Sequence, residues 1–238
     1  MFEDRGDVCR SARSEAQPSV TLLLILVNVA AFVGQNIGDY LRFSPVSQSF
    51  ALSLAGLRHG YFWQLITFQF LHIPLADGGM FHLLGDVFVI YVFGRILEQA
   101  IGKSGFLALY LLGGIVGGLL QMAVVVFFPA RFGLAVVGAS AGACGLIAAF
   151  ATLLPRRPLS LFFLPIRFQA RTLLWLAVLA SLAGLFLPGR GVGVAHAAHL
   201  GGLLTGILFA RWIARTRPTP AFAANPVGGP SAITRQTE

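Results

Sequence analysis

The chain alternates long apolar runs with shorter polar segments. Six of the runs come close to the roughly 20 residues that an α-helix needs to cross a hydrocarbon core, and they cover residues 20–37, 81–100, 105–128, 140–154, 172–187 and 194–214. The fourth and fifth runs are short, so they need little tilt or neighbouring helices that shield their ends. The pattern predicts an all-α membrane protein in which residues 19–214 form a bundle of six transmembrane helices.

Composition and charge placement support this interpretation. Hydrophobic residues make up 56% of the 238-residue chain and charged residues only 11%, whereas a soluble domain carries about 25% charged residues. Of the 17 lysines and arginines, all but Arg42, Arg58, Arg131 and Arg190 fall on the predicted side that also holds both termini. Because positive residues concentrate in cytoplasmic loops, we expect both termini in the cytoplasm.

The basic residues flank the apolar runs instead of forming one stripe. The net charge of +8 therefore indicates contact with the anionic lipid of a bilayer and no nucleic-acid partner. The two cysteines, Cys9 and Cys144, match no metal or redox spacing, and we interpret both as free thiols. No cofactor and no metal are predicted.

Three segments lie outside the predicted helices. Residues 1–18 are expected to form a polar cytoplasmic tail, without a cleavable signal peptide. Residues 215–238, rich in Pro, Ala and Gly, are expected to form a disordered cytoplasmic tail. The external segment of about residues 38–80 is rich in aromatic residues, so we expect it to pack in the outer interface, where Trp and Tyr prefer to lie.

Ser140 stands in a GxSxG pattern, between Gly138 and Gly142, at the start of the fourth apolar run. The glycines let the chain turn sharply and let another backbone approach the hydroxyl, as a nucleophilic serine requires. A serine that only packs helices together gives the same local pattern.

The predicted topology brings other polar groups to the depth of Ser140. The fourth and sixth helices both start at the outer face, so Ser140 and His199 share a level, and Gly202 and Gly206 allow a close helix contact. His82 reaches the same layer from the second helix. A buried contact histidine remains the alternative for His199 alone. With a serine level with it, and Asp86 the one acid at this depth, a Ser140–His199 dyad is the economical interpretation.

In this order the motifs resemble the rhomboid family of intramembrane serine proteases. The resemblance runs from about Tyr61 to Ala214 and rests on these residues: Trp63 and Gln64; His82 to Asp86; Gly94 to Glu98; Gly138 to Gly142; and Ala198 to Gly202 with Gly206. It implies a six-helix rhomboid-like bundle with Ser140 as nucleophile and His199 as general base. The implied oxyanion donors are His82 and the Ser140 backbone N–H, and the implied substrates are transmembrane proteins, cut near the outer face. His196 lies outside the family's catalytic position.

The chain departs from the family pattern mainly at Asp86, where the third oxyanion donor is an asparagine. An ionised carboxylate would repel an oxyanion, so we expect Asp86 to work protonated or to turn toward His82, and cleavage to survive Asp86→Asn. Gln64 replaces the usual arginine after Trp63, and the stretch from 72 to 82 is longer than typical. Glu98 is expected to cap a helix or to pair with a nearby basic residue, Arg95 or Lys103.

Other functions stay open at this stage. A rhomboid-like pseudoprotease would bind membrane clients without cutting them. A metal-binding membrane protein could use His82 with Asp86, four residues apart, and His196 with His199, three apart. A generic transporter would be expected to show inverted repeats, which are not obvious here. We expect a multi-pass protein of a bacterial cytoplasmic membrane; its oligomeric state does not follow from the sequence.

Overall fold

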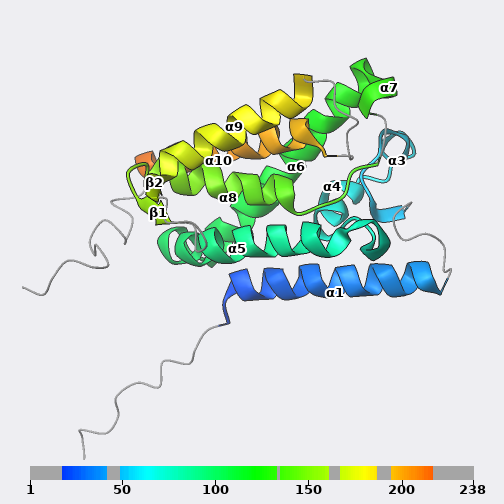
Figure 1. The fold of residues 1–238 in the computed structure, drawn as a ribbon, viewed down its shortest axis with the longest axis horizontal. Helices are drawn as coiled ribbons and strands as arrows, with labels where there is room; N and C mark the ends of the chain where they lie inside the picture. The colour runs from blue at the N-terminus through cyan, green and yellow to red at the C-terminus, as the bar shows by residue number, and fades with distance from the viewer. Residues whose placement is uncertain (1–17, 42–48, 133–134, 161–166, 187–193, 217–238) are drawn as a thin grey trace, which may run out of the picture.

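A computed structural model describes residues 18–41, 49–132, 135–160, 167–186 and 194–216. The predicted tails lie outside these residues, apart from a few positions next to α1 and α10, and so do Cys9, Arg42 and Arg190. The long helices are α1 (Val20–Tyr40), α5 (Gly79–Ile101), α6 (Lys103–Phe127), α8 (Ser140–Leu153), α9 (Ala170–Phe186) and α10 (His196–Thr216) (Figure 1). Each follows one predicted apolar run to within three residues at either end.

The helices α1, α5, α6 and α10 are long and apolar enough to cross a membrane. The helices α8, with 14 residues, and α9, with 17, are shorter. This agrees with the short fourth and fifth runs. The described part of the chain is thus a mainly helical membrane bundle.

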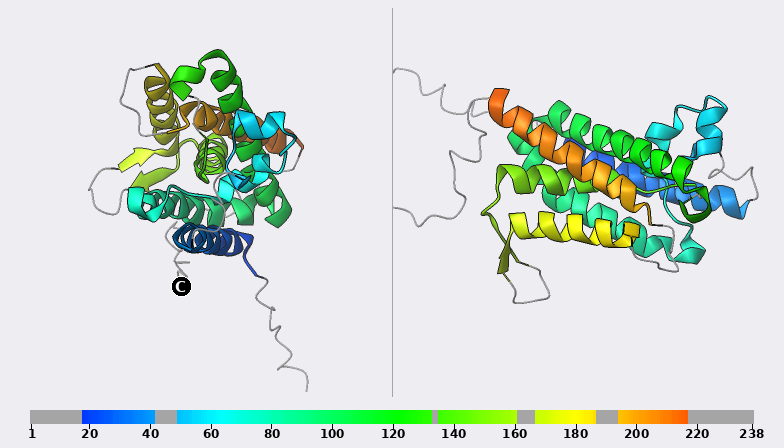
Figure 2. Two further views of the ribbon diagram at one scale, coloured as in Figure 1. Left: turned by 90° about the vertical axis from the view of Figure 1, so that its right-hand side faces the viewer. Right: turned by 90° about the horizontal axis from the view of Figure 1, so that it is seen from above.

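Helix α8 forms the centre of this bundle, with α5, α6, α9 and α10 around it (Figure 2, left). Its small side chains let the neighbours approach closely, and Leu146 and Phe150 anchor the largest cluster of buried residues. Helix α1 lies on the outside, packed against α5 (Figure 1). An apolar residue on α8 therefore meets protein on nearly every side, which explains why so short a helix is stable.

Two glycines of α10 fix its distance from α8. A Cβ atom at Gly202 would overlap the carbonyl oxygen of Ala141, and one at Gly206 would overlap that of Gly145. Helix backbones in contact at this range need residues without side chains. The two glycines thus allow the first half of α10 to pack directly against the first half of α8.

The segment between α1 and α5 is more ordered than a loop. It contains α3 (Leu54–Arg58), α4 (Gln64–Thr67), η1 (Phe68–Phe70) and η2 (Leu75–Asp77). Gln64, fully buried, links its parts: Oε1 accepts from the Ser53 backbone N–H at 3.2 Å, and Nε2 donates to the Ser49 carbonyl at 3.3 Å. Short helix α7 (Pro129–Phe132) lies at the same end of the bundle (Figure 1).

The prediction of an all-α fold is wrong in one detail. Strand β1 (Pro158–Ser160) pairs antiparallel with β2 (Arg167–Gln169) between α8 and α9. Strands of three residues are too short to give an alternating pattern in the sequence, which is why they were not predicted. The predicted boundary at residue 214 is also early, since α10 continues to Thr216.

Glu98, near the end of α5, caps the start of α1. Its carboxylate accepts hydrogen bonds from Ser19 Oγ at 2.7 Å, from the Val20 and Thr21 backbone N–H groups at 2.7 and 2.9 Å, and from Thr21 Oγ1 at 2.7 Å. A carboxylate suits a helix N-terminus because it meets unpaired N–H groups and the positive end of the helix dipole. This contact ties the outer helix to the bundle.

Candidate active site

Helix α8 begins inside the bundle, well short of the end that α1 and α6 reach (Figures 1 and 2). An extended stretch leads the chain inward to Ser140. Val136 in this stretch bridges to Leu52 through a pair of backbone hydrogen bonds of 2.8 and 3.0 Å, and the Gly138 N–H donates to the Phe68 carbonyl at 3.0 Å. The external segment therefore positions the backbone that carries Ser140.

Gly138 meets two requirements that only glycine satisfies. Its φ of 129° lies in a region that side chains disfavour. A Cβ atom there would also come within 2.8 Å of His82 Cε1. The glycine therefore allows the His82 ring to sit directly beside the turn that precedes Ser140.

Ser140 and His199 face each other across α8 and α10. The distance between Ser140 Oγ and His199 Nε2 is 2.8 Å, a hydrogen-bond distance, and both residues are partly buried. In the tautomer that carries its proton on Nδ1, His199 accepts the serine proton at Nε2. A serine hydroxyl hydrogen-bonded to an imidazole is the arrangement that activates a nucleophile.

Gln121 of α6 holds the start of α10. Its side chain is 3% exposed, and its Oε1 accepts a hydrogen bond from the Ala198 backbone N–H at 3.3 Å. That N–H lies in the first turn, where a helix has no carbonyl of its own to offer. Gln121 was not predicted from the sequence, although an amide inside an apolar span is a recognisable signal.

His82, in the first turn and a half of α5, lies beside Gly138: a Cβ atom at that glycine would come within 3.0 Å of His82 Nε2 and 3.6 Å of Ser140 Oγ. Its Nδ1 accepts from the Ile73 backbone N–H at 3.5 Å. A neutral imidazole that accepts at Nδ1 carries its proton on Nε2. His82 can therefore donate a hydrogen bond toward the mouth of α8, beside the N-terminal N–H group of Ser140.

Asp86 turns toward two histidines. Its Oδ2 lies 3.7 Å from His82 Nε2 and 3.5 Å from His72 Nε2, and the aspartate is 7% exposed. His72 is fully buried and comes from the external segment. No role was predicted for His72, because nothing in the stretch from 72 to 82 reveals that the chain folds back over α5.

His196 packs between His199 and helix α9. Its ring lies edge-on to His199 with centroids 5.9 Å apart, and a Cβ atom at Gly184 would overlap the His196 ring. His196 therefore joins α10 to α9. Among the described residues, no group of three or more His, Cys, Asp or Glu side chains is arranged to hold a metal ion, and the described thiol, Cys144, is free.

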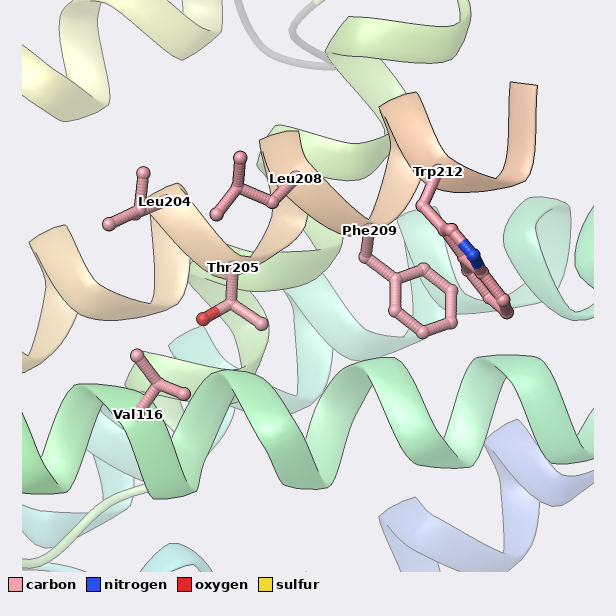
Figure 3. Close-up of a pocket in the computed structure, with 6 residues that line it drawn as sticks. All are labelled: Val116, Leu204, Thr205, Leu208, Phe209 and Trp212. Carbon is pink, nitrogen blue, oxygen red and sulfur yellow. The ribbon is translucent and has the colours of Figure 1, made fainter. Parts of the chain in front are cut away.

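A separate hollow lies on the outer surface of α6 and α10. It measures about 350 Å³ and is lined by Val116, Leu204, Thr205, Leu208, Phe209 and Trp212 (Figure 3). Its walls are almost wholly apolar, as expected of a surface that faces lipid chains. Neither Ser140 nor His199 lines this hollow, so it is not part of the dyad.

Comparison with known proteins assigns the family. Residues 59–216 match the Rhomboid domain, which covers the external segment from His59 and all of α5 to α10. The chain is 33% identical over 142 residues, 56% of its length, to mitochondrial rhomboid protein 1 of Saccharomyces cerevisiae. It is 35% identical over 131 residues, 54% of its length, to mitochondrial presenilin-associated rhomboid-like protein A of Danio rerio. The protein belongs to the rhomboid family.

A third relative matches more of the chain. Rhomboid protease GlpG of Yersinia pestis is 28% identical over 212 residues, which cover 89% of this chain and 68% of that protein. The matches cover only 38% and 33% of the two mitochondrial relatives. The protein is thus a membrane-embedded rhomboid, a family that includes intramembrane serine proteases.

Proposed function

We propose that this protein is an intramembrane serine endopeptidase that cleaves the transmembrane segments of other membrane proteins by a Ser140–His199 dyad. The observation that supports it most is the 2.8 Å contact between Ser140 Oγ and His199 Nε2, made by two helices that Gly202 and Gly206 hold together. A rhomboid without proteolytic activity would not need the serine hydroxyl and the imidazole at hydrogen-bond distance.

The chemistry needs only these two side chains as acid and base. Ser140 Oγ attacks the carbonyl carbon of the scissile peptide while His199 Nε2 takes its proton. The imidazolium then protonates the leaving amine, the C–N bond breaks, and an acyl-enzyme ester remains on Ser140. His199 next takes a proton from a water that attacks the ester, and returns it to Ser140 as the acid product leaves.

The tetrahedral intermediates carry a negative oxygen that must be stabilised in place. The Ser140 backbone N–H at the start of α8 and the Nε2–H of His82 are the proposed donors, and the helix dipole adds to the first. Each such donor is worth about 3 kcal/mol in a dry site. Asp86 Oδ2 lies 3.7 Å from Nε2 of the proposed donor His82, so its charge affects the same oxygen.

The proposed orientation places six spans in the bilayer, with both termini in the cytoplasm and the dyad below the outer face. The β1–β2 hairpin and the C-terminal end of α10 lie at the end of the bundle where α1 starts, and α8 begins toward the opposite end (Figure 1). By sequence, Arg157 and Arg167 belong to the hairpin region and Arg211 and Arg215 to the last turns of α10, whereas Ser140 is the first residue of α8. Positive charge on the side away from the dyad supports a cytoplasmic location for that end.

The proposed substrates are single-span proteins with small or helix-weakening residues near the outer face. A protease reads extended backbone, and a helix hides its own carbonyl groups, so such residues expose the scissile bond. A bacterial cytoplasmic membrane is the proposed location, as the likeness to GlpG over most of the chain favours. The mitochondrial relatives make an organelle membrane the alternative.

Purified wild type, Ser140→Ala and His199→Ala in detergent or vesicles test this proposal. With a model transmembrane substrate, the wild type should produce two fragments, and a fluorophosphonate probe should label Ser140. Both variants should lose cleavage by at least about 1,000-fold, and Ser140→Ala should lose labelling. A folded wild type that neither cleaves any of a panel of substrates nor reacts with the probe would identify a pseudoprotease. Activity abolished by chelators would instead favour the metal-dependent alternative.

A further inference from the structure

His72 is the buried histidine of the external segment that faces Asp86. Among the described residues, neither ring nitrogen of His72 has a hydrogen-bond partner, and neither does Asp86 Oδ2. Buried polar atoms are nearly always paired, so three unpaired atoms in one cluster need an explanation. His72 Nε2 and Asp86 Oδ2, 3.5 Å apart, are the natural partners of each other.

His72 is held firmly in this place. The side chain of the buried Gln35 in α1 makes two hydrogen bonds with the His72 backbone. Its Nε2 donates to the His72 carbonyl at 2.7 Å, and its Oε1 accepts from the His72 N–H at 3.1 Å. The ring packs edge-on against Phe32, with centroids 6.0 Å apart, and against His82, at 5.3 Å. Contacts from α1 and α5 therefore fix the orientation of the His72 ring relative to Asp86.

The role of His72 can be inferred from the charge of Asp86. An ionised carboxylate beside the oxyanion site would raise the energy of the tetrahedral intermediate, and it would also draw the Nε2–H of His82 toward itself. His82 is poorly placed to supply a compensating proton, because the Ile73 N–H already points at its Nδ1. Among the described residues, no N–H group donates to either ring nitrogen of His72, so His72 is better placed to supply that proton.

We propose that His72 is a positioning residue, which shares a proton with Asp86 so that the pair has no net charge and His82 keeps its N–H for the oxyanion. The proton can reside on either partner, and the sum of the charges is zero in both cases. A neutral His72–Asp86 pair then places no net charge beside the oxyanion, as a neutral amide at the position of Asp86 would. This inference rests on the proposed protease function, since it concerns the oxyanion of that reaction.

A double-mutant cycle tests the pair. His72→Gln keeps a hydrogen-bond donor but cannot carry the extra proton, and Asp86→Asn removes the charge that needs compensation. We expect His72→Gln alone to lower kcat about 100-fold, the effect of a lost oxyanion donor, with KM nearly unchanged. In the Asp86→Asn background, the same change should lower kcat by less than about threefold. His59→Gln, a histidine replacement in the exposed part of the external segment, is the matched control and should behave as the wild type.

Thermal unfolding of the wild type, the two single variants and the double variant gives a second readout that needs no activity. With Asp86 present, His72→Gln leaves a buried charge unpaired and should lower Tm by about 5 to 10 °C; in the Asp86→Asn background it should lower Tm by clearly less. If the wild type has no activity, the proposed function fails while the cycle in Tm still tests the pair. Equal losses in both backgrounds, in kcat and in Tm, would overturn the inference and leave His72 a packing residue.

Discussion

Gln121 Oε1 accepts the backbone N–H of Ala198, the residue that directly precedes His199, at 3.3 Å. An amide on α6 therefore fixes the first turn of α10, and with it the imidazole that faces Ser140. We expect Gln121→Met, which keeps the volume but removes the acceptor, to destabilise the protein by about 1 to 3 kcal/mol, the effect of a buried unpaired donor.

The same replacement should lower kcat about tenfold, because a small displacement of His199 lengthens the contact with Ser140. Gln121→Glu retains an acceptor oxygen and serves as the comparison. Cleavage rates and Tm of both variants check this prediction. Full activity in Gln121→Met would show that the Gly202 contact alone positions His199.

Gly202→Ala should disturb the dyad more strongly. The added methyl group would overlap the Ala141 carbonyl, so α10 must move away from α8. We expect a loss of more than about 3 kcal/mol in stability, in the range of severe overpacking, and loss of fluorophosphonate labelling in the protein that remains folded. Gly85→Ala is the matched control: a Cβ atom there meets nothing within 4 Å, so Tm and labelling should be unchanged or slightly improved.

Gly138→Ala should test the turn that precedes Ser140 without changing the packing of α8 against α10. The methyl group would crowd the His82 ring and a positive φ would be occupied by a side chain. The backbone strain alone amounts to about 1 to 2 kcal/mol. If His82 is the proposed oxyanion donor, we expect kcat to fall at least about 100-fold, because the ring loses its place. Steady-state kinetics on the folded variant would reveal this, and a change confined to KM would contradict it.

Glu98→Gln should weaken the attachment of α1 without touching the dyad. The carboxylate accepts four hydrogen bonds from residues 19 to 21, and the amide replaces a charged acceptor by a neutral group with one acceptor atom. We expect a loss of about 2 to 3 kcal/mol, typical of hydrogen bonds to a charged group. Thermal unfolding measures it, with Asp77→Asn as an exposed acid control. An unchanged Tm would mean that α1 is held by its apolar face alone.

The positions of the long helices were predictable because burial in lipid demands continuous apolar runs, and these are visible in one dimension. The proximity of Ser140, His199 and His82 was predictable, because the topology fixes which helix ends share a depth. The chain lacked any comparable signal for β1 and β2. The helical bounds of the external segment were also out of reach, since its residues have neither the length nor the period of a span.

The residues that support the candidate site were harder to predict than Ser140, His199 and His82. His72, Gln35 and Gln121 act through contacts between segments that are distant in sequence, at separations of 37 and 77 residues. His72 and Gln121 were visible as polar residues with apolar neighbours, whereas Gln35 stands beside the polar Asn36. The partner of each one depended on how the external segment and α10 fold back, and no local pattern encodes that.

The placement of Gln35 has a practical consequence. The match to the Rhomboid domain starts at residue 59, yet Gln35, which grips His72, lies in α1, ahead of that start. A shortened chain trimmed to the matched domain would keep Ser140, His199 and Asp86, but lose the Gln35 hydrogen bonds that hold His72 opposite the aspartate. Under the proposed function, kinetic constants measured on such a trimmed protein would describe a site in which His72 is no longer held. They should be compared with those of the 238-residue chain.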